Sequence, residues 1–268
     1  FNLINTYRGT VFSCIADNKD SAGYISESAI KNKSIADVFI DVNTGMNRTG
    51  IGIDEVMPLF AILKNLKGIR VRGLHAYDGH IRDTDIAQRQ IKSDEAFGKL
   101  QVLRDKLTAQ FGFTAKIVIG GSPTFPTHVK RENVECSPGT FVFWDHGYKI
   151  NIPDQPFDCA ALVLTRIISI VDERTVCTDL GYKSVSSENP LPRVYFLNAP
   201  DAEAVAQNEE HLVLKVKDAA MFKPGDVLYG VPQHICPTVA LYEKAVVVED
   251  NEATGEWNVI ARNRKINI

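Results

Sequence analysis

The segment Asp37-Val-Phe-Ile-Asp-Val42 is a nearly continuous apolar run. Such a run is typical of a strand in a parallel sheet covered on both faces, because neither face then needs polar side chains. It is followed by apolar residues at i, i+3, i+4 and i+7, namely Val56, Leu59, Phe60 and Leu63. This spacing predicts an amphipathic helix over residues 54–66, which Gly68 can end.

The same alternation extends to both sides of this unit. Short apolar runs predict further strands at residues 10–16, 69–75, 116–119 and 134–136. Helical spacing predicts helices over residues 20–31 and 85–110. Strands that alternate with helices imply right-handed crossovers and a parallel sheet. We therefore expect residues 1–147 to form an α/β domain.

The pattern of apolar and polar residues changes after about residue 148. Short Val-, Ile- and Leu-rich runs separated by turn-rich segments occur at residues 160–171, 193–197, 211–216, 227–231, 245–249 and 257–261. No long helical period is present. Residues 148–268 are therefore predicted to form a β-rich second domain.

Composition limits the possible partners. The 268 residues are 44% hydrophobic and carry a net charge of −3, with Lys and Arg scattered along the chain. We expect no nucleic acid and no membrane as a partner, since there is no basic cluster, no membrane-spanning run and no signal-peptide pattern. The five cysteines are odd in number and widely spaced, which favours free thiols and a cytoplasmic location.

Polar clusters follow four of the predicted strands. They lie at residues 43–50, 75–80, 120–124 and 137–140. The carboxyl ends of parallel strands carry the active sites of barrels and doubly wound sheets. Arg48, in a turn bracketed by glycines, could bind a phenolate, carboxylate or phosphate, or could be a surface arginine. His75 and His80 could perform acid–base chemistry or contact a ligand ring, or one of the two could have a structural role.

The loops Gly120-Gly-Ser-Pro-Thr124 and Ser137-Pro-Gly-Thr140 combine glycine with hydroxyl residues. Such loops can present backbone N–H groups to a phosphate, although each alone could be a tight turn. Two of them at consecutive strand ends favour a phosphorylated ligand, because the last strands of a β/α barrel often build a phosphate site.

His234 and Cys236 stand two residues apart in the apolar segment 231–241, which we predict to be a strand. Residues i and i+2 of a strand point to the same face, so the pair could bind a divalent metal such as zinc. The alternative is a buried cysteine beside a hydrogen-bonded histidine. A further polar cluster, Gln207-Asn-Glu-Glu-His211, could be a charged loop or the rim of a site, and we assign it no role.

Together these motifs resemble the D-threonine aldolase and D-serine dehydratase-like family, the fold type III pyridoxal 5′-phosphate (PLP) enzymes with an alanine racemase-type barrel. The resemblance runs over essentially the whole chain, from Asp41-Val-Asn-Thr-Gly-Met-Asn-Arg-Thr-Gly50 through Gly73-Leu-His-Ala-Tyr-Asp-Gly-His80 to Pro232-Gln-His-Ile-Cys-Pro-Thr238. It also includes Asp179-Leu-Gly-Tyr-Lys183 and the Gln207 cluster. The resemblance implies a (β/α)8 PLP-binding barrel followed by a C-terminal β domain.

The resemblance also implies residue roles. Arg48 would contact the cofactor ring or its phenolic oxygen, with His75 and Tyr77 close to the ring. Four residues would hold the phosphate, namely Gly121, Ser122, Gly139 and Thr140. His234 and Cys236 would bind a divalent metal, Zn or Mn.

In this family the Schiff-base lysine lies on the first barrel strand, in a region that would precede Phe1. No lysine of this sequence occupies a matching position, and five β/α strands are recognisable where a closed barrel has eight. We therefore expect the N-terminal strands of the barrel to be missing and the chain to be the C-terminal part of a longer polypeptide.

The expected function is that of a metal-assisted PLP lyase that cleaves D-threonine-like substrates to glycine and an aldehyde. The alternatives are D-serine dehydration to pyruvate and ammonia, amino acid racemisation, or an inactive remnant that binds a phosphorylated ligand. The His-x-Cys pair resembles the zinc-dependent dehydratases, whereas the other motifs are closer to the aldolases. The expected partner is a small D-amino acid, and the resemblance implies a homodimer.

Overall fold

The computed structural model describes residues 1–263, and the chain divides into two compact units, Phe1–Gly139 and the part from Thr140 onward. The first unit contains β1 (Ser13–Ala16), β2 (Ala36–Val42), β3 (Ile69–Ala76), β4 (Lys116–Ile119) and β5 (Val134–Cys136). Its helices are α1 (Asn2–Thr6), α2 (Lys19–Lys31), α3 (Val56–Leu63), α4 (Ile86–Phe111) and α5 (Phe125–His128). None of the helices within residues 1–263 is both long and apolar enough to cross a membrane.

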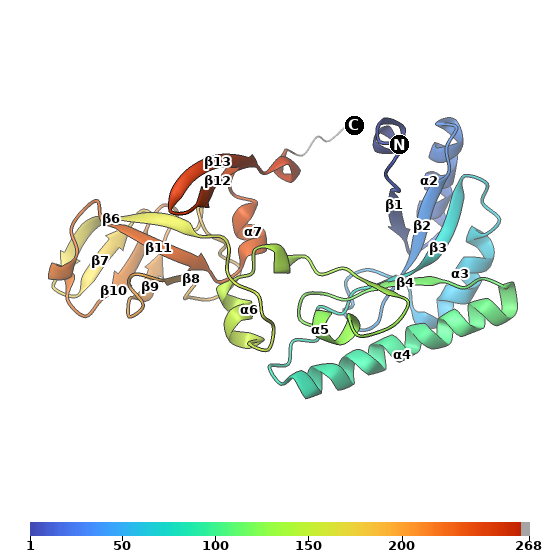
Figure 1. The fold of residues 1–268 in the computed structure, drawn as a ribbon, viewed down its shortest axis with the longest axis horizontal. Coiled ribbons are helices and arrows are strands. Elements are labelled where there is room, and N and C mark those ends of the chain that lie inside the picture. The colour runs from blue at the N-terminus through green and yellow to red at the C-terminus, as the bar shows by residue number, and fades with distance from the viewer. Residues whose placement is uncertain (264–268) are drawn as a thin grey trace. The chain divides into compact units, whose positions relative to one another are not determined.

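The five strands of the first unit form a parallel sheet in the order β1-β2-β3-β4-β5 (Figure 1). Strand β2 has six buried residues among its seven, as its apolar run predicts. Val56, Leu59, Phe60 and Leu63 are buried against the same core, which confirms the predicted face of α3. Parallel pairing gathers the carboxyl ends of these strands at one edge, and that edge positions the candidate site.

Helix α4 shows how local sequence sets the boundaries of an element. Asp85 caps its start, since its carboxylate accepts a hydrogen bond from the Ala87 amide at 2.8 Å. Gly112 ends it in the left-handed conformation, with φ of 65°. Four of its buried core residues follow helical spacing, namely Phe97, Leu100, Leu103 and Leu107. The predicted helix at residues 85–110 is therefore confirmed.

The second unit is mainly β structure. Its strands are β6 (Val163–Asp172), β7 (Thr175–Thr178), β8 (Val194–Phe196), β9 (Glu203–Gln207), β10 (Leu212–Lys215), β11 (Val227–Pro232), β12 (Lys244–Glu249) and β13 (Glu252–Asn258). Two short helices are α6 (His146–Asn151) and α7 (Ile235–Val239). Six strands form an antiparallel sheet in the order β8-β11-β6-β7-β10-β9 (Figure 1). The predicted class, α/β followed by a β-rich part, is confirmed.

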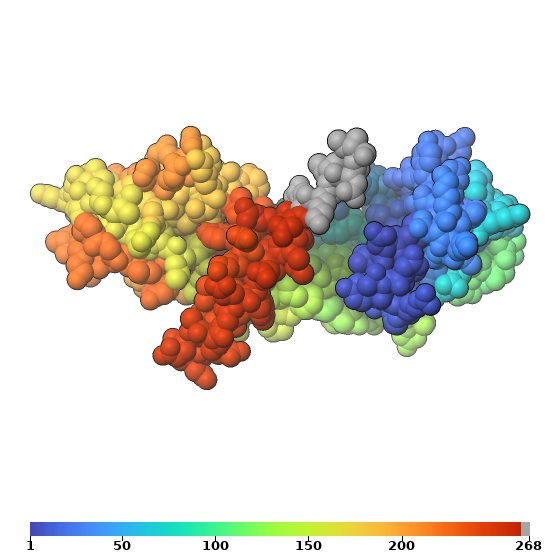
Figure 2. Space-filling view, turned by 90° about the horizontal axis from the view of Figure 1, so that it is seen from above, coloured from blue at the N-terminus to red at the C-terminus, as the bar shows by residue number. Residues whose placement is uncertain are grey.

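Strands β12 and β13 form a separate hairpin, which appears as the red arm of the second unit in Figure 2. All residues of β13 are exposed, and Trp257 is 63% exposed. The domain boundary predicted between residues 147 and 148 stays a prediction.

The prediction of one strand over residues 231–241 is wrong. Strand β11 ends at Pro232, and helix α7 begins at Ile235 with His234 as its N-cap residue. Pro232 cannot donate a ladder hydrogen bond, whereas Pro237 is tolerated in the first turn of a helix, where its amide would be unpaired anyway. His234 and Cys236 therefore meet at a helix start rather than on one face of a strand.

Candidate functional site

Arg48 lies in the loop that follows β2, and Asn43 shapes this loop. The Asn43 side-chain oxygen accepts hydrogen bonds from the amides of Gly45 at 3.0 Å and Asn47 at 3.1 Å. Gly50 has φ of 97°, and a Cβ there would lie 2.7 Å from the Asn43 nitrogen, so only glycine fits. The loop places the Arg48 guanidinium 4.5 Å from the centre of the Tyr77 ring, in cation–π geometry.

His75 is paired with a buried carboxylate on the neighbouring strand. Its Nδ1 lies 2.6 Å from Oδ1 of Asp41, which is 4% exposed. Burial raises the pKa of Asp41, but hydrogen bonds from His75 and Thr49 and the positive charge of Arg48 outweigh it and leave the pKa below its usual value. An ionised Asp41 accepts the Nδ1 proton, so Nε2 is the nitrogen left to interact with a ligand.

Hydrogen bonds to Asp78 hold the loop between β4 and α5 in place. The Asp78 carboxylate accepts hydrogen bonds from Thr124 Oγ1 at 2.7 Å and from the Gly121 amide at 3.1 Å. His128 Nε2 lies 2.7 Å from its second oxygen, and these side chains are fully buried. Arg131 donates to His128 Nδ1, and since arginine has no acceptor, Nε2 must carry the proton given to Asp78.

The pKa of Asp78 predicts how acid affects this loop. Burial raises it, but the hydrogen bonds from His128, Thr124 and Gly121 outweigh burial and lower it below its usual value. A lowered folded-state pKa stabilises the fold above the unfolded value of about 4, and this contribution is lost as the pH falls further.

We expect Asp78→Asn to destabilise the first unit by about 1–3 kcal/mol at neutral pH and to flatten its loss of stability in acid. Hydrogen exchange of peptides that cover residues 117–128 measures this, with the exposed Asp105→Asn variant as the control. Equal exchange in both variants and the wild type at all pH values would contradict this role of Asp78.

The predicted phosphate residues are engaged in different ways. The Gly121 amide already donates to Asp78, and a Cβ at Gly121 would lie 3.0 Å from the Tyr77 ring. The Ser137 hydroxyl donates to the Gly120 carbonyl at 3.0 Å and so joins the two strand-end loops. Ser122 is buried, whereas Gly139 is exposed with open space around its Cα. The first unit thus brings together Arg48, His75, Tyr77 and Gly121.

The predicted metal pair lies in the second unit. His234 Nδ1 lies 2.5 Å from Oε1 of Glu188, and Cys236 Sγ lies 3.1 Å from Thr140 Oγ1. Hydrogen bonds with Cys236 and Glu188 raise the pKa of His234 to about 9, because together they outweigh burial, which lowers it. The same contact lowers the pKa of Cys236 and so favours the thiolate, the form that binds metals.

A buried carboxylate fixes the chain beneath this pair. Asp145 is 2% exposed and accepts hydrogen bonds from the Tyr148 amide at 2.9 Å and the Ile235 amide at 3.1 Å. It therefore ties the starts of α6 and α7 together. Burial raises the pKa of Asp145, although these two amide hydrogen bonds oppose the change.

The donor set of the pair suits a borderline-soft metal. Glu188 occupies Nδ1 of His234, which leaves Nε2 and the Cys236 sulfur as an N,S pair of the kind that zinc prefers. Within residues 1–263 no group of three or more His, Cys, Asp or Glu side chains has metal-holding geometry. Two protein ligands, His234 and Cys236, would leave coordination positions open for water or substrate.

Sequence reasoning missed several of these partners. Asp78 lies between Tyr77 and His80 in a motif that the sequence analysis quotes, and this position is the one sequence feature that points to it. Glu188 lies 46 residues before His234 in an unremarkable Ser-Ser-Glu-Asn stretch, and nothing in the sequence links the two. His80 is exposed and lines a cavity of about 360 Å³ with Thr44, Lys92 and Glu95.

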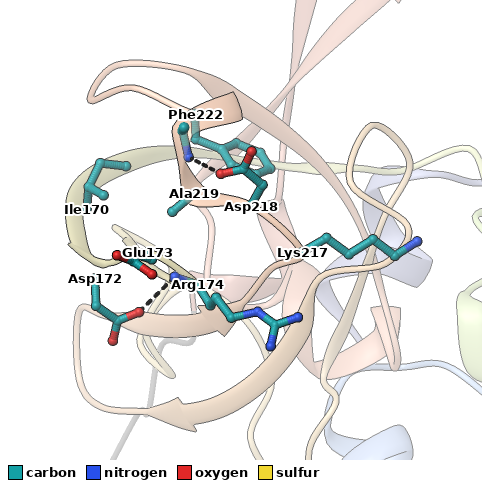
Figure 3. A pocket seen from close by; sticks show the side chains of 9 residues that line it. Ile170, Asp172, Glu173, Arg174, Lys217, Asp218, Ala219 and Phe222 are labelled. Atoms are coloured by element: carbon teal, nitrogen blue, oxygen red, sulfur yellow. Dashed lines mark hydrogen bonds between the residues drawn. The ribbon is translucent and has the colours of Figure 1, made fainter.

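A larger cavity of about 610 Å³ in the second unit lies elsewhere, between the β6–β7 turn and residues 217–222 (Figure 3). Two of its three carboxylates, those of Asp172 and Asp218, accept hydrogen bonds from nearby backbone amides. Asp172 accepts from the Arg174 amide at 2.8 Å, and Asp218 accepts from the Ala220 amide at 2.9 Å. No residue that the sequence predicts for the site lines this cavity, so the candidate residues are the two groups described above, one in each unit.

Two protein families match this chain. The family described as "Alanine racemase, N-terminal domain" matches residues 7–146, and "Putative serine dehydratase domain" matches residues 160–248. The chain belongs to the alanine racemase N-terminal domain family. The predicted α/β barrel class of alanine racemase type, with a following β domain, is thereby confirmed.

Relatives within this family include two aldolases. D-threonine aldolase of Arthrobacter sp. is 27% identical over 256 residues, 93% of this chain and 67% of the relative. 3-hydroxy-D-aspartate aldolase of Paracoccus denitrificans (strain Pd 1222) is 27% identical over 267 residues, 95% of this chain and 67% of the relative. The crystal structure of D-threonine aldolase from Filomicrobium marinum superposes with a TM-score of 0.84 at 23% identity, covering 92% of this chain and 68% of that one. This last likeness establishes the fold.

Proposed function

We propose that this chain carries the site of a PLP-dependent, metal-assisted lyase that acts on D-3-hydroxy amino acids, with cleavage of D-threonine-like substrates to glycine and an aldehyde. The observation that carries the proposal is the His234–Cys236 pair, with its imidazole oriented by Glu188. This pair belongs to a chain whose aldolase relatives match it over 93–95% of its length.

The first unit fits the cofactor. Arg48, held over Tyr77, offers a fixed cation to a phenolic oxygen, and His75 offers the nitrogen that Asp41 leaves available. Gly121 leaves space beside the Tyr77 ring that a side chain would fill. From the resemblance, we assign the phosphate to Gly121, Ser122 and Gly139 of this unit and to Thr140, which follows Gly139 in the sequence. When bound, PLP supplies an electron sink for the bond that breaks at the substrate's α-carbon.

The metal is the second part of the proposal. His234 would ligate through Nε2 and Cys236 through its thiolate, which Thr140 contacts. A Zn or Mn ion, when bound, acts as a Lewis acid on the substrate's β-hydroxyl. Because His234 has a raised pKa, binding of the metal would release a proton from it at neutral pH.

Dehydration of D-serine is the second candidate. Residues 160–248 match the putative serine dehydratase domain, and they contain the metal pair with cysteine at its second position. A thiolate favours zinc over the harder manganese. The same pair could thus assist departure of hydroxide from the β-carbon.

Product analysis separates these functions. The natural polypeptide that contains this sequence, supplied with PLP and Zn²⁺ or Mn²⁺, is expected to convert D-threonine to glycine and acetaldehyde, and L-threonine not at all. A chelator should suppress turnover. Pyruvate and ammonia from D-serine would replace the first proposal by the second, chelator-resistant racemisation would contradict the metal role, and binding without turnover would indicate an inactive ligand-binding protein.

Three further elements belong to the proposal. The Schiff-base lysine is assigned to no residue of this chain. A homodimer follows from the resemblance, and analytical ultracentrifugation measures it. The five free cysteines support a cytoplasmic location, where thiols stay reduced.

A further inference from the structure

A series of hydrogen bonds starts at Gln207, a residue of the polar cluster to which we assign no role from the sequence. The Gln207 side-chain oxygen accepts a hydrogen bond from Arg193 Nη1 at 2.8 Å, and its amide donates to the Leu180 carbonyl at 3.0 Å. Arg193 Nε donates in turn to the Asn189 carbonyl at 2.7 Å. Gln207 and Arg193 thus fix the backbone next to Glu188.

This series of hydrogen bonds continues through Glu188 to His234. Glu188 Oε1 accepts a hydrogen bond from Asn189 Nδ2 at 3.1 Å. The Ser186 hydroxyl lies 3.5 Å from the same oxygen and shares its one proton between this oxygen and the His234 carbonyl. The same oxygen lies 2.5 Å from His234 Nδ1. Asn189 therefore directs the carboxylate oxygen that meets the imidazole.

The backbone of His234 is held as well as its ring. Its carbonyl accepts hydrogen bonds from Thr238 Oγ1 at 2.7 Å and from Ser186 Oγ at 3.2 Å. The Ser186 amide donates to Thr238 Oγ1 at 3.2 Å, so Ser186, Thr238 and the His234 carbonyl are all joined by hydrogen bonds. The segment around Ser186 and Glu188 thus holds both the main chain and the side chain of His234.

We propose that Glu188 is a positioning residue for the metal, which accepts the Nδ1 proton of His234 and so directs Nε2 toward the ion. This inference rests on the proposed metal role of His234 and Cys236. It gives Gln207 a function, since Gln207 and Arg193 orient Glu188 through Asn189. Carboxylate partners of this kind fix the tautomer and the ring orientation of ligating histidines.

A surface ion pair is the simpler interpretation of the same contact. His234 and Glu188 are 39% and 45% exposed, and exposed ion pairs contribute little to stability. That interpretation predicts no change in metal affinity when Glu188 is replaced. The additional hydrogen bonds to Glu188 and to the His234 carbonyl favour the positioning role, because they restrict the geometry at both ends of the contact.

Cobalt titration tests the inference without turnover. Co²⁺ is added to the wild type, Glu188→Ala, Glu188→Gln and Glu256→Gln, and the thiolate-to-cobalt absorption reports ligation by Cys236. Glu256, which pairs with Lys244, is the matched control because it is also an exposed carboxylate of the second unit. We expect Glu188→Ala to weaken Co²⁺ binding about 10–100-fold, and Glu188→Gln, which keeps an acceptor, to weaken it less. Glu256→Gln should bind as the wild type does.

Two results would overturn the inference, and they differ from each other. Wild-type affinity in both Glu188 variants would show that Glu188 does not position the ligand, while the metal role stands. Absence of a cobalt–thiolate band in the wild type would remove the metal role itself, and the inference with it. Glu188→Gln keeps the test valid should Glu188→Ala fail to fold, and thermal unfolding identifies that case.

Discussion

The Cys236→Ala variant is expected to lose the cobalt–thiolate band and to cleave D-threonine about 10²–10⁴-fold more slowly than the wild type, because Lewis-acid stabilisation is worth several kcal/mol. The contact with His234 lowers the pKa of Cys236 and so favours the thiolate that binds metals. Removing the sulfur leaves one protein ligand of the pair. His234→Ala should have the same effect, since either change breaks the pair.

Matched controls are available in the same unit. Cys177, on β7, donates to the Thr178 carbonyl and takes no part in the site. His211 is exposed and follows β9. Cys177→Ala and His211→Ala are expected to keep the cobalt band and the sensitivity to chelators. Wild-type affinity and chelator sensitivity in Cys236→Ala would show that the metal binds elsewhere.

The Arg48→Ala variant is expected to bind pyridoxamine 5′-phosphate about 10–150-fold more weakly than the wild type. Loss of a hydrogen bond to a charged group costs about 1.5–3 kcal/mol, and Arg48 also stacks on Tyr77 at 4.5 Å. Arg48→Lys should recover little of this, because an ammonium cannot reproduce a planar guanidinium. Fluorescence titration measures the affinity and needs no Schiff-base lysine.

The control for Arg48 is Arg8→Ala, which removes an exposed arginine from the same unit. It should bind the probe as the wild type does. If Arg48→Ala also binds normally, Arg48 is the surface arginine of a glycine-bracketed turn and the cofactor assignment in this loop fails.

Much of the fold can be predicted from residues that are close together in the sequence. The apolar run of β2, the helical spacing of α3 and the Asp85 and Gly112 caps of α4 each depend on residues a few positions apart. Such signals predict the alternation of strands and helices, and this alternation places Arg48, Tyr77 and Gly121 at one edge of the sheet. The parallel pairing then follows from general rules.

The parts that sequence did not predict depend on contacts between distant residues. Asp78 meets His128 across 50 residues, and Glu188 meets His234 across 46. Periodicity carries no information about such pairs. Val and Ile in the apolar run 231–241 favour a strand, whereas Pro232 and Pro237 fix the change from β11 to α7.

Binding of N-(5′-phosphopyridoxyl)-D-threonine, a stable adduct of cofactor and substrate, tests the central claim most directly. It requires the cofactor and metal residues of this chain but no lysine. Isothermal titration calorimetry is expected to show that the D-adduct binds at least about tenfold more tightly than the L-adduct, or roughly 1.4 kcal/mol, and that Zn²⁺ strengthens only the D-adduct. Equal affinity for both adducts, unaffected by Zn²⁺, would contradict a metal-assisted site for D-3-hydroxy amino acids.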